Sequence, residues 1–263
     1  MATETNVEMN RVNPETPRQE VVDLMRKDGY VLMKNALDAD SLAKLKEAYA
    51  KEEAAVPHEE GALRMEVPMI LGKGDAFENL MDWPVTFPIA RDLIGEDISL
   101  ATGGELDHKY PHSKAYIGWH NDFQWMKDMA YPLPNFWVRC TFFVDDITQD
   151  MGPFTLLPGS HRSDHACPYD MGNKYVEGEI GITGKAGDCL INCTEIWHKN
   201  TDNVSDKHRR MVMVLYKHIW MKEWEDGSGV CPKQKARQTD PIRKQLVGDI
   251  QWHCTKEFPA KDV

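Results

Sequence analysis

The chain has 263 residues, of which 41% are hydrophobic and 28% are charged, and its formal net charge is −11. This composition is that of a folded globular protein and excludes disorder of the whole chain. An acidic chain lacks the basic stripe that nucleic acid or an anionic membrane would require, so neither is an expected partner.

Targeting and redox features point to the cytoplasm. The N-terminal residues are polar and lack the basic-then-apolar order of a signal peptide, and no apolar run is as long as a membrane span. Six cysteines stand without a CxxC spacing, which predicts buried, reduced thiols and argues against a zinc or redox motif. A cytoplasmic protein is therefore expected.

The first third of the chain predicts helices. Residues 1–16 are polar and predict a flexible tail. Gly29 ends one amphipathic pattern, and Asp38 and Asp40 stand at capping positions before another. The expected helices are 17–29, 38–55, 77–81 and 85–94, with extended segments at 30–33 and 63–71.

From residue 97 onwards the pattern changes to short apolar runs separated by Gly, Pro, Asn and Asp clusters, which predicts strands. The runs are residues 98–106, 114–122, 136–144, 154–157, 188–193 and 209–219. Helices followed by strands favour a mainly β protein with a helical layer, as a β-barrel or jelly roll, over alternating βα units. We predict one domain over residues 17–263, with a barrel core at about 97–219 and a last helix near 241–247.

A histidine and a carboxylate, His120 and Asp122, end the expected strand 114–122. Alternate residues of a strand point to one side, so both side chains would project together into the space that this face encloses. His198 follows the strand 188–193 and supplies a third candidate. Two histidines and one carboxylate form the facial triad that binds ferrous iron in non-haem oxygenases. A structural histidine explains each residue taken singly, whereas the three together favour a metal site.

A triad leaves one face of the metal open, where 2-oxoglutarate can chelate. The distal carboxylate of such a keto acid needs a cation, and the planar guanidinium of arginine suits that role. Arg209 begins the strand after His198, and alternation would send one member of the pair Arg209-Arg210 inward. In the run 137–144, alternation places Arg139 and Thr141 on the predicted inner face.

Three ordered segments resemble the phytanoyl-CoA dioxygenase family. They are Trp-His-Asn-Asp at 119–122, Met-Gly-Pro-Phe-Thr-Leu-Leu-Pro-Gly-Ser-His-Arg at 151–162, and the segment from Gly187-Asp188 through His198 to Arg210. The opening Asp-Gly-Tyr-Val at 28–31 is similar too, so the resemblance runs over about residues 21–219. It implies an iron(II)- and 2-oxoglutarate-dependent oxygenase on a double-stranded β-helix preceded by N-terminal helices.

The resemblance also implies roles for single residues. His120, Asp122 and His198 become the iron ligands and catalytic centre, Arg209 the anchor of 2-oxoglutarate, and Thr141 a second contact of that co-substrate. The implied reaction consumes O2, hydroxylates a C–H bond of a small molecule by default, and releases succinate and CO2. Ascorbate is an optional reductant.

Contacts with the primary substrate are predicted from position alone. The candidates are Arg64, Phe123, Trp125 and Arg139, and core packing or a salt bridge explains each of them equally well. Two other functions compete: a metal-binding barrel without oxygenase activity, and an iron oxygenase that does not use 2-oxoglutarate. The sequence leaves the substrate and the oligomeric state open.

Overall fold

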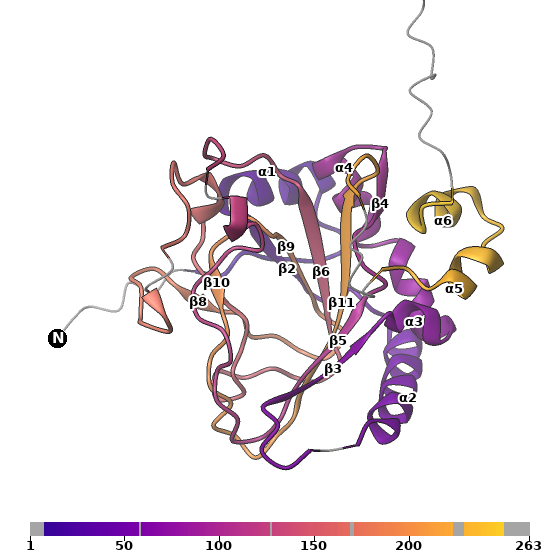
Figure 1. Cartoon of the computed structure of the whole chain (residues 1–263), viewed down its shortest axis with the longest axis horizontal. Coiled ribbons are helices and arrows are strands. Elements are labelled where there is room, and N and C mark those ends of the chain that lie inside the picture. The colour runs from indigo at the N-terminus through magenta and orange to yellow at the C-terminus, as the bar shows by residue number, and fades with distance from the viewer. Residues whose placement is uncertain (1–7, 58, 127, 169–170, 223–228, 250–263) are drawn as a thin grey trace, which may run out of the picture.

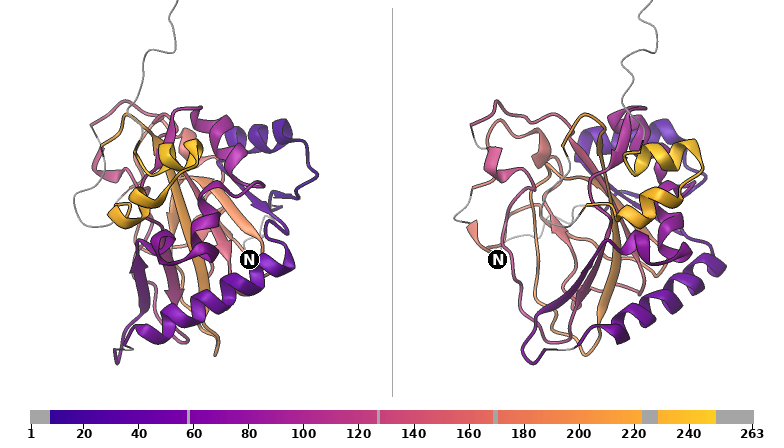
Figure 2. Two further views of the ribbon diagram at one scale, coloured as in Figure 1. Left: turned by 90° about the vertical axis from the view of Figure 1, so that its right-hand side faces the viewer. Right: turned by 45° about the vertical axis from the view of Figure 1, so that its right-hand side comes forward.

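The computed structural model describes residues 8–57, 59–126, 128–168, 171–222 and 229–249. A main sheet lies at the centre, with helices on one side and a small sheet on the other (Figures 1 and 2). This sheet-rich arrangement with helices is consistent with the predicted jelly roll.

The main sheet has the strand order β1-β2-β9-β6-β11-β5-β3, with β4 paired to β11. Its pairs are antiparallel except β1 with β2. The strands are β1 (Arg11–Val12), β2 (Tyr30–Met33), β3 (Arg64–Pro68), β4 (Ile98–Leu100), β5 (Glu105–Lys109), β6 (Trp137–Phe143), β9 (Cys189–Cys193) and β11 (Arg209–His218).

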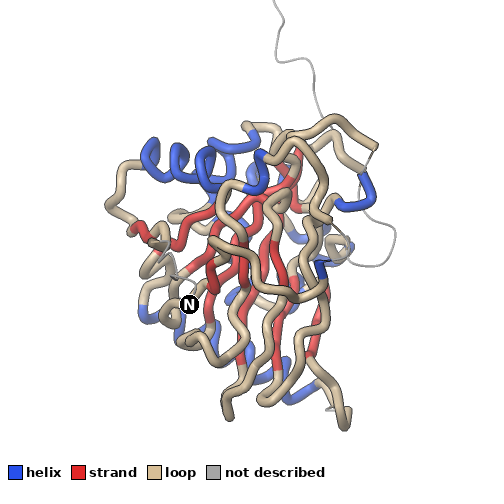
Figure 3. Tube along the Cα trace, turned by 90° about the vertical axis from the view of Figure 1, so that its left-hand side faces the viewer, coloured by secondary structure: helices blue, strands red, loops and turns tan. Residues whose placement is uncertain are grey.

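The small sheet has the order β10-β7-β8. It consists of β7 (Thr155–Leu156), β8 (Ile180–Gly181) and β10 (His198–Lys199). Apolar side chains such as Leu156 and Ile180 pack against Leu190 and Met211 of the main sheet. Long loops run over this side of the main sheet (Figure 3). The space between the two sheets is therefore the interior of the barrel.

Helices cover the opposite face of the main sheet. They are α1 (Arg18–Asp28), α2 (Ala39–Ala55), α3 (Asp75–Glu78), α4 (Phe87–Ile94), α5 (Pro232–Arg237) and α6 (Pro241–Leu246), with the short 3-10 turns η1 (Ile70–Lys73) and η2 (Asn79–Asp82). Two further 3-10 turns, η3 (Gln124–Met126) and η4 (Ser160–Arg162), lie in the loops that follow Asp122 and β7. Val138, Cys140 and Phe142 pack into this helix-side core. The face assignment predicted for β6 is thus confirmed, and Arg139 and Thr141 face the barrel interior.

Local signals set the helix ends. Gly29 follows α1 with φ 81°, a left-handed conformation that glycine adopts without strain, and its N–H donates to the Met25 carbonyl. The Asp38 carboxylate accepts the Ser41 N–H at 2.8 Å and caps α2. Both predicted helices are confirmed.

Helix α2 is held to the sheet by its buried Leu45 and Tyr49. Replacing Leu45 by alanine is expected to lower the free energy of unfolding by about 2–5 kcal/mol, because a fully buried side chain leaves a cavity. Urea denaturation measures this. Leu42→Ala, at a partly buried position of the same helix, should cost clearly less, and equal losses would contradict this packing.

Several predicted boundaries were wrong. Arg11–Val12 forms β1 beside β2, so the predicted tail of residues 1–16 contains a strand. The main sheet also includes β2 and β3, which widens the barrel beyond 97–219. The run 98–106 is two strands, β4 and β5, separated by a turn at Gly103 and Gly104. These pairings join segments distant in the chain, which local patterns do not reveal.

The predicted strand 114–122 is an irregular segment. It runs antiparallel to residues 194–203, but side chains replace part of the backbone ladder: the Ala115 N–H donates to the Asp202 carboxylate at 2.8 Å. Gly118 meets Gly172 so closely that a Cβ at 118 would lie 2.5 Å from the Gly172 oxygen. The tight approach and the side-chain bonds prevent a regular strand here.

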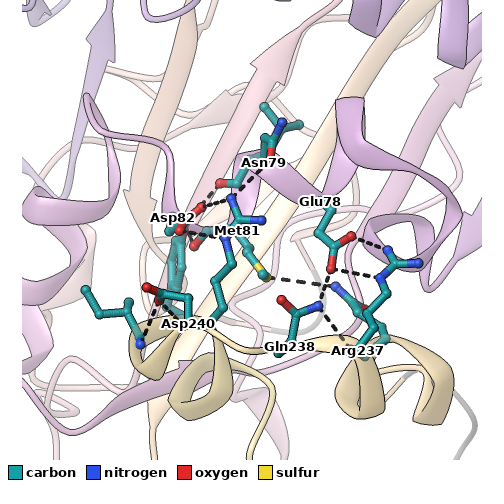
Figure 4. Close-up of polar contacts among 12 residues, drawn as sticks. Glu78, Asn79, Met81, Asp82, Arg237, Gln238 and Asp240 are labelled. Atoms are coloured by element: carbon teal, nitrogen blue, oxygen red, sulfur yellow. Dashed lines mark hydrogen bonds and ion pairs between the residues drawn. The ribbon is translucent and has the colours of Figure 1, made fainter.

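The C-terminal helices α5 and α6 attach to the helical layer through polar contacts (Figure 4). Arg237 and Gln238 bind the buried Glu78 carboxylate. Arg243 binds both oxygens of Asp82 at 2.8 Å. These contacts place the C-terminal part of the described chain on the helix side, away from the barrel interior.

No helix within the described residues combines the length and the apolar character that a membrane crossing needs. The five described cysteines are free thiols, as predicted, whereas Cys254 lies outside the described residues.

Candidate active site

His120, Asp122 and His198 converge on one point. The Nε2 atoms of His120 and His198 lie 3.8 Å and 3.4 Å from the same carboxylate oxygen of Asp122. The three candidate ligand atoms all lie within 4.8 Å of one another. The three predicted ligands, which are up to 78 residues apart in the sequence, are therefore brought together as a set able to hold a metal ion.

Backbone pairing fixes this convergence. His120 and His198 exchange both backbone hydrogen bonds, at 2.9 Å and 2.8 Å. The Asp122 N–H donates to the Thr194 carbonyl at 3.1 Å. The irregular segment 114–122 thus positions its two ligands against the chain that carries the third, although it is not a strand.

Each imidazole is oriented by a carbonyl two residues before it. Nδ1 of His120 lies 2.8 Å from the Gly118 oxygen, and Nδ1 of His198 lies 2.9 Å from the Ile196 oxygen. A proton on Nδ1 satisfies both contacts and leaves Nε2 with a lone pair for a metal. The Phe154 ring stacks on His198, with ring centroids 4.8 Å apart.

The electrostatics favour the ligand forms of these side chains. Burial, together with the neighbouring His198, lowers the pKa of His120 to about 4, so this imidazole is neutral at pH 7. Burial alone would raise the pKa of Asp122, but the Arg139 guanidinium and His198 outweigh it and hold that pKa well below its usual range. A neutral His120 and an ionised Asp122 are the forms in which these two side chains can bind a divalent iron ion.

Arg209 lies in the barrel interior and is fully buried. Its guanidinium donates to Asp107 at 2.7 Å and to the Gly152 carbonyl at 2.9 Å. Its Nε atom and the second oxygen of Asp107 have no hydrogen-bond partner among the described residues. Arg210 points to the other face, toward Asp145 and Glu53. The predicted inward and outward directions of the two arginines are therefore confirmed.

The other predicted site residues have different surroundings. Thr141 is buried on the inner face of β6, opposite Leu190 and Met213. Arg139 donates to the Asp122 carboxylate and therefore adjoins the triad. Arg64 pairs with Glu66 at 2.6 Å and stacks over Tyr116.

The two aromatic residues after the triad differ from each other. Phe123 is buried and packs against Phe136 and Trp137, which makes it a core residue. Trp125 is 53% exposed and contacts Phe123, with ring centroids 5.4 Å apart.

Sequence reasoning missed four charged residues of the interior, of which Asp107, Lys109 and Glu195 are buried and Glu105 is partly buried. Glu105, Asp107 and Lys109 are alternate residues of β5, so their side chains point to the same face of the sheet. This period of two would have revealed an inner face if the whole strand had been recognised. Burial and the neighbouring Arg209 lower the pKa of Lys109 to about 8. Glu195, just before His198, accepts the Phe136 N–H at 2.7 Å, and burial raises its pKa to about 8.

Two histidines and one carboxylate grouped in the interior of a sheet-rich fold match the donor set of non-haem iron oxygenases. Comparison with known families agrees: the model of the phytanoyl-CoA dioxygenase family matches residues 25–211. The chain belongs to this family, and it is accordingly an iron- and 2-oxoglutarate-dependent dioxygenase.

Relatives and solved structures are distant. Ectoine dioxygenase of Stutzerimonas stutzeri is 23% identical over 234 residues, which cover 76% of each chain. The epimerase SnoN, solved with Fe3+, alpha ketoglutarate and nogalamycin RO, superposes with a TM-score of 0.61 at 20% identity, over 77% of this chain and 84% of its own. HygX from Streptomyces hygroscopicus, with nickel and 2-oxoglutarate bound, gives 0.66 at 14%, over 79% and 89%. These likenesses show the fold.

Proposed function

We propose that the protein oxidises a C–H bond of a small molecule, by hydroxylation in the first instance, while 2-oxoglutarate and O2 are converted to succinate and CO2. The convergence of His120, Asp122 and His198 on one point carries this proposal. Family membership supports it, because the matched segment 25–211 includes all three residues.

The ligand residues have defined tasks in this proposal. Iron held by the triad supplies the oxidative chemistry, in which O2 and the keto acid are activated. The Gly118 and Ile196 carbonyls keep each Nε2 directed at the metal position. Arg139 holds one oxygen of Asp122, so the carboxylate presents its other oxygen to the histidines. The buried surroundings exclude water from the reacting centre.

We assign Arg209 as the anchor of the distal carboxylate of 2-oxoglutarate, with Thr141 as a second contact. The unpartnered Nε of Arg209 supports this role, because a buried donor without an acceptor offers a place for an incoming anion. Asp107 holds the same guanidinium, so the keto acid has to share Arg209 with this carboxylate. Lys109 on the same face adds a positive charge that offsets Asp107.

Further features complete the proposal. We infer that the two sheets form a double-stranded β-helix preceded by the helices α1 and α2, and that these elements make up one domain. We also infer that the protein is cytoplasmic and that ascorbate can keep its iron reduced.

The primary substrate is a small polar molecule. Arg139 has an Nε atom without a partner among the described residues, which suits an anionic group of the substrate, and Arg64 and Trp125 remain candidates for its outer contacts.

Succinate release tests this function. Purified protein with iron, ascorbate and 2-oxoglutarate is expected to form succinate slowly even without primary substrate, because uncoupled turnover consumes the keto acid. A metal-binding barrel without oxygenase activity would release none with any pool of small metabolites. Such a result, together with the absence of a keto-acid-dependent absorption band under anaerobic iron, would refute the proposal.

A further inference from the structure

A second group of two histidines and one glutamate lies outside the barrel interior. Glu53 belongs to α2, His108 to β5, and His208 directly precedes β11. Nε2 of His108 lies 2.6 Å from Nδ1 of His208 and 3.7 Å from Oε1 of Glu53. The three candidate ligand atoms lie within 4.8 Å of one another, as tightly grouped as the triad.

This group lies on the helix-covered face of the main sheet. His108 is paired in register with Arg210, and the Arg210 side chain reaches Glu53 of α2 on that face. The neighbouring Lys109 and Arg209 point the other way, into the barrel. The sheet therefore separates this group from His120, Asp122 and His198, and the two sets are independent.

The Glu53 carboxylate is held ready to act as a ligand. Its Oε2 accepts from Arg210 at 3.2 Å, while its Oε1 faces His108. Arg210 is also bound to Asp145 at 2.7 Å. The carboxylates of Glu53 and Asp145 together carry one more charge than the Arg210 guanidinium can neutralise. A net negative charge therefore lies beside the two imidazoles, and it attracts a cation. Because Oε2 of Glu53 is held by Arg210, the direction of Oε1 is fixed, in the way that outer hydrogen bonds orient metal ligands.

A pocket adjoins the group. Its volume is about 610 Å³, and its lining includes Glu53 and His208 together with Tyr110 and His112. An ion held by the group would therefore have an open coordination position toward solvent. One helical turn before Glu53, the hydroxyl of the fully buried Tyr49 has no hydrogen-bond partner among the described residues.

We propose that Glu53, His108 and His208 bind a divalent transition-metal ion, with Zn2+ as the best match to two imidazoles and one carboxylate. Two nitrogens on one tetrahedral zinc lie about 3.3 Å apart, given Zn–N distances of about 2.0–2.1 Å. His208 is partly exposed and precedes its strand, so a shift of under about 1 Å opens the present contact to that separation. The bound ion joins α2 to β5 and β11.

Zinc titration tests the proposal without recourse to enzyme activity. The parent is the variant His120→Ala/His198→Ala, in which the triad no longer competes for metal. Metal-free parent is expected to bind one Zn2+ per chain in calorimetry and to melt at a higher temperature with Zn2+ than without. Glu53→Gln and His208→Gln, each made in this parent, should weaken binding by more than about 100-fold, because each removes a direct ligand.

Matched controls separate the site from adventitious binding. His112→Gln alters a histidine of the same pocket that pairs with the exposed Asp206, and it should leave zinc affinity unchanged. Circular dichroism shows which variants fold. Because Glu53→Gln and His208→Gln each change one ligand, either variant tests the site even if the other does not fold. A parent that binds no Zn2+, or zinc affinity equal in the parent and in both ligand variants, would overturn the proposal. The His108–His208 contact would then be a structural hydrogen bond.

Discussion

Replacing Asp122 by asparagine is expected to lower iron affinity by more than about 100-fold, and succinate release should fall accordingly at iron concentrations that just saturate the wild-type protein. The amide keeps the shape of the carboxylate but supplies no negative charge to the metal. It also leaves the Arg139 guanidinium, which adjoins the site, without its anionic partner, and an uncompensated cation repels a divalent ion.

Iron binding and turnover should be measured separately for this variant. Anaerobic titration with ferrous iron gives the affinity, and succinate release is measured both at the iron concentration that just saturates the wild-type protein and at iron that saturates the variant. Asp206→Asn is the matched control, since Asp206 is an exposed aspartate that pairs with His112 and not with a triad residue. Wild-type iron affinity in Asp122→Asn would mean that the metal binds elsewhere.

The triad was predictable from the sequence although the strand that was expected to carry it does not exist. The prediction needed His120 and Asp122 to project together, and an extended segment of any kind achieves that over two residues. The pairing of His120 with His198 supplies the same constraint as a strand would. Ordered motifs therefore predicted which residues converge more reliably than they predicted the secondary structure that carries them.

Polar residues on buried strands hid much of the remaining chemistry. In β5 the sequence Glu-Leu-Asp-His-Lys carries charges toward the barrel and a histidine toward the helices, so neither face shows the apolar alternation that predicts a strand. Sequence patterns are least informative where both faces of a strand carry polar groups. The second histidine group was missed for the same reason, and also because Glu53 comes from a helix that is distant in sequence.

Sheet membership of the N-terminal segments was also beyond local patterns. β2 is a short apolar run that could be recognised as a strand, but its partner β9 lies about 160 residues later, and nothing in either run specifies the other. β1 is shorter still and is defined by its pairing with β2. Period and composition predict elements, whereas long-range pairing depends on the packing of the whole core.

Removal of the Arg209 guanidinium is expected to raise the KM for 2-oxoglutarate by roughly 100-fold and to leave iron affinity unchanged. A bidentate contact with a carboxylate contains two charge-assisted hydrogen bonds of about 1.5–3 kcal/mol each, and a loss of about 3 kcal/mol corresponds to that factor. Arg209→Ala alone would leave Asp107 buried without its cation, at a cost of about 3–5 kcal/mol in stability.

The decisive variant is therefore Arg209→Met/Asp107→Asn, which removes both charges together and preserves the volume of the interior. Asp107→Asn alone shows the effect of the second change, and Arg91→Gln, a surface arginine that pairs with Glu96, controls for a general loss of positive charge. Succinate release against 2-oxoglutarate concentration gives KM, and anaerobic titration gives iron affinity. If KM changes by less than about threefold in the double variant while iron binding is retained, the keto acid is anchored by another cation of the interior. Lys109 and Arg139 are then the residues to replace, because both are buried on the same face of the sheet.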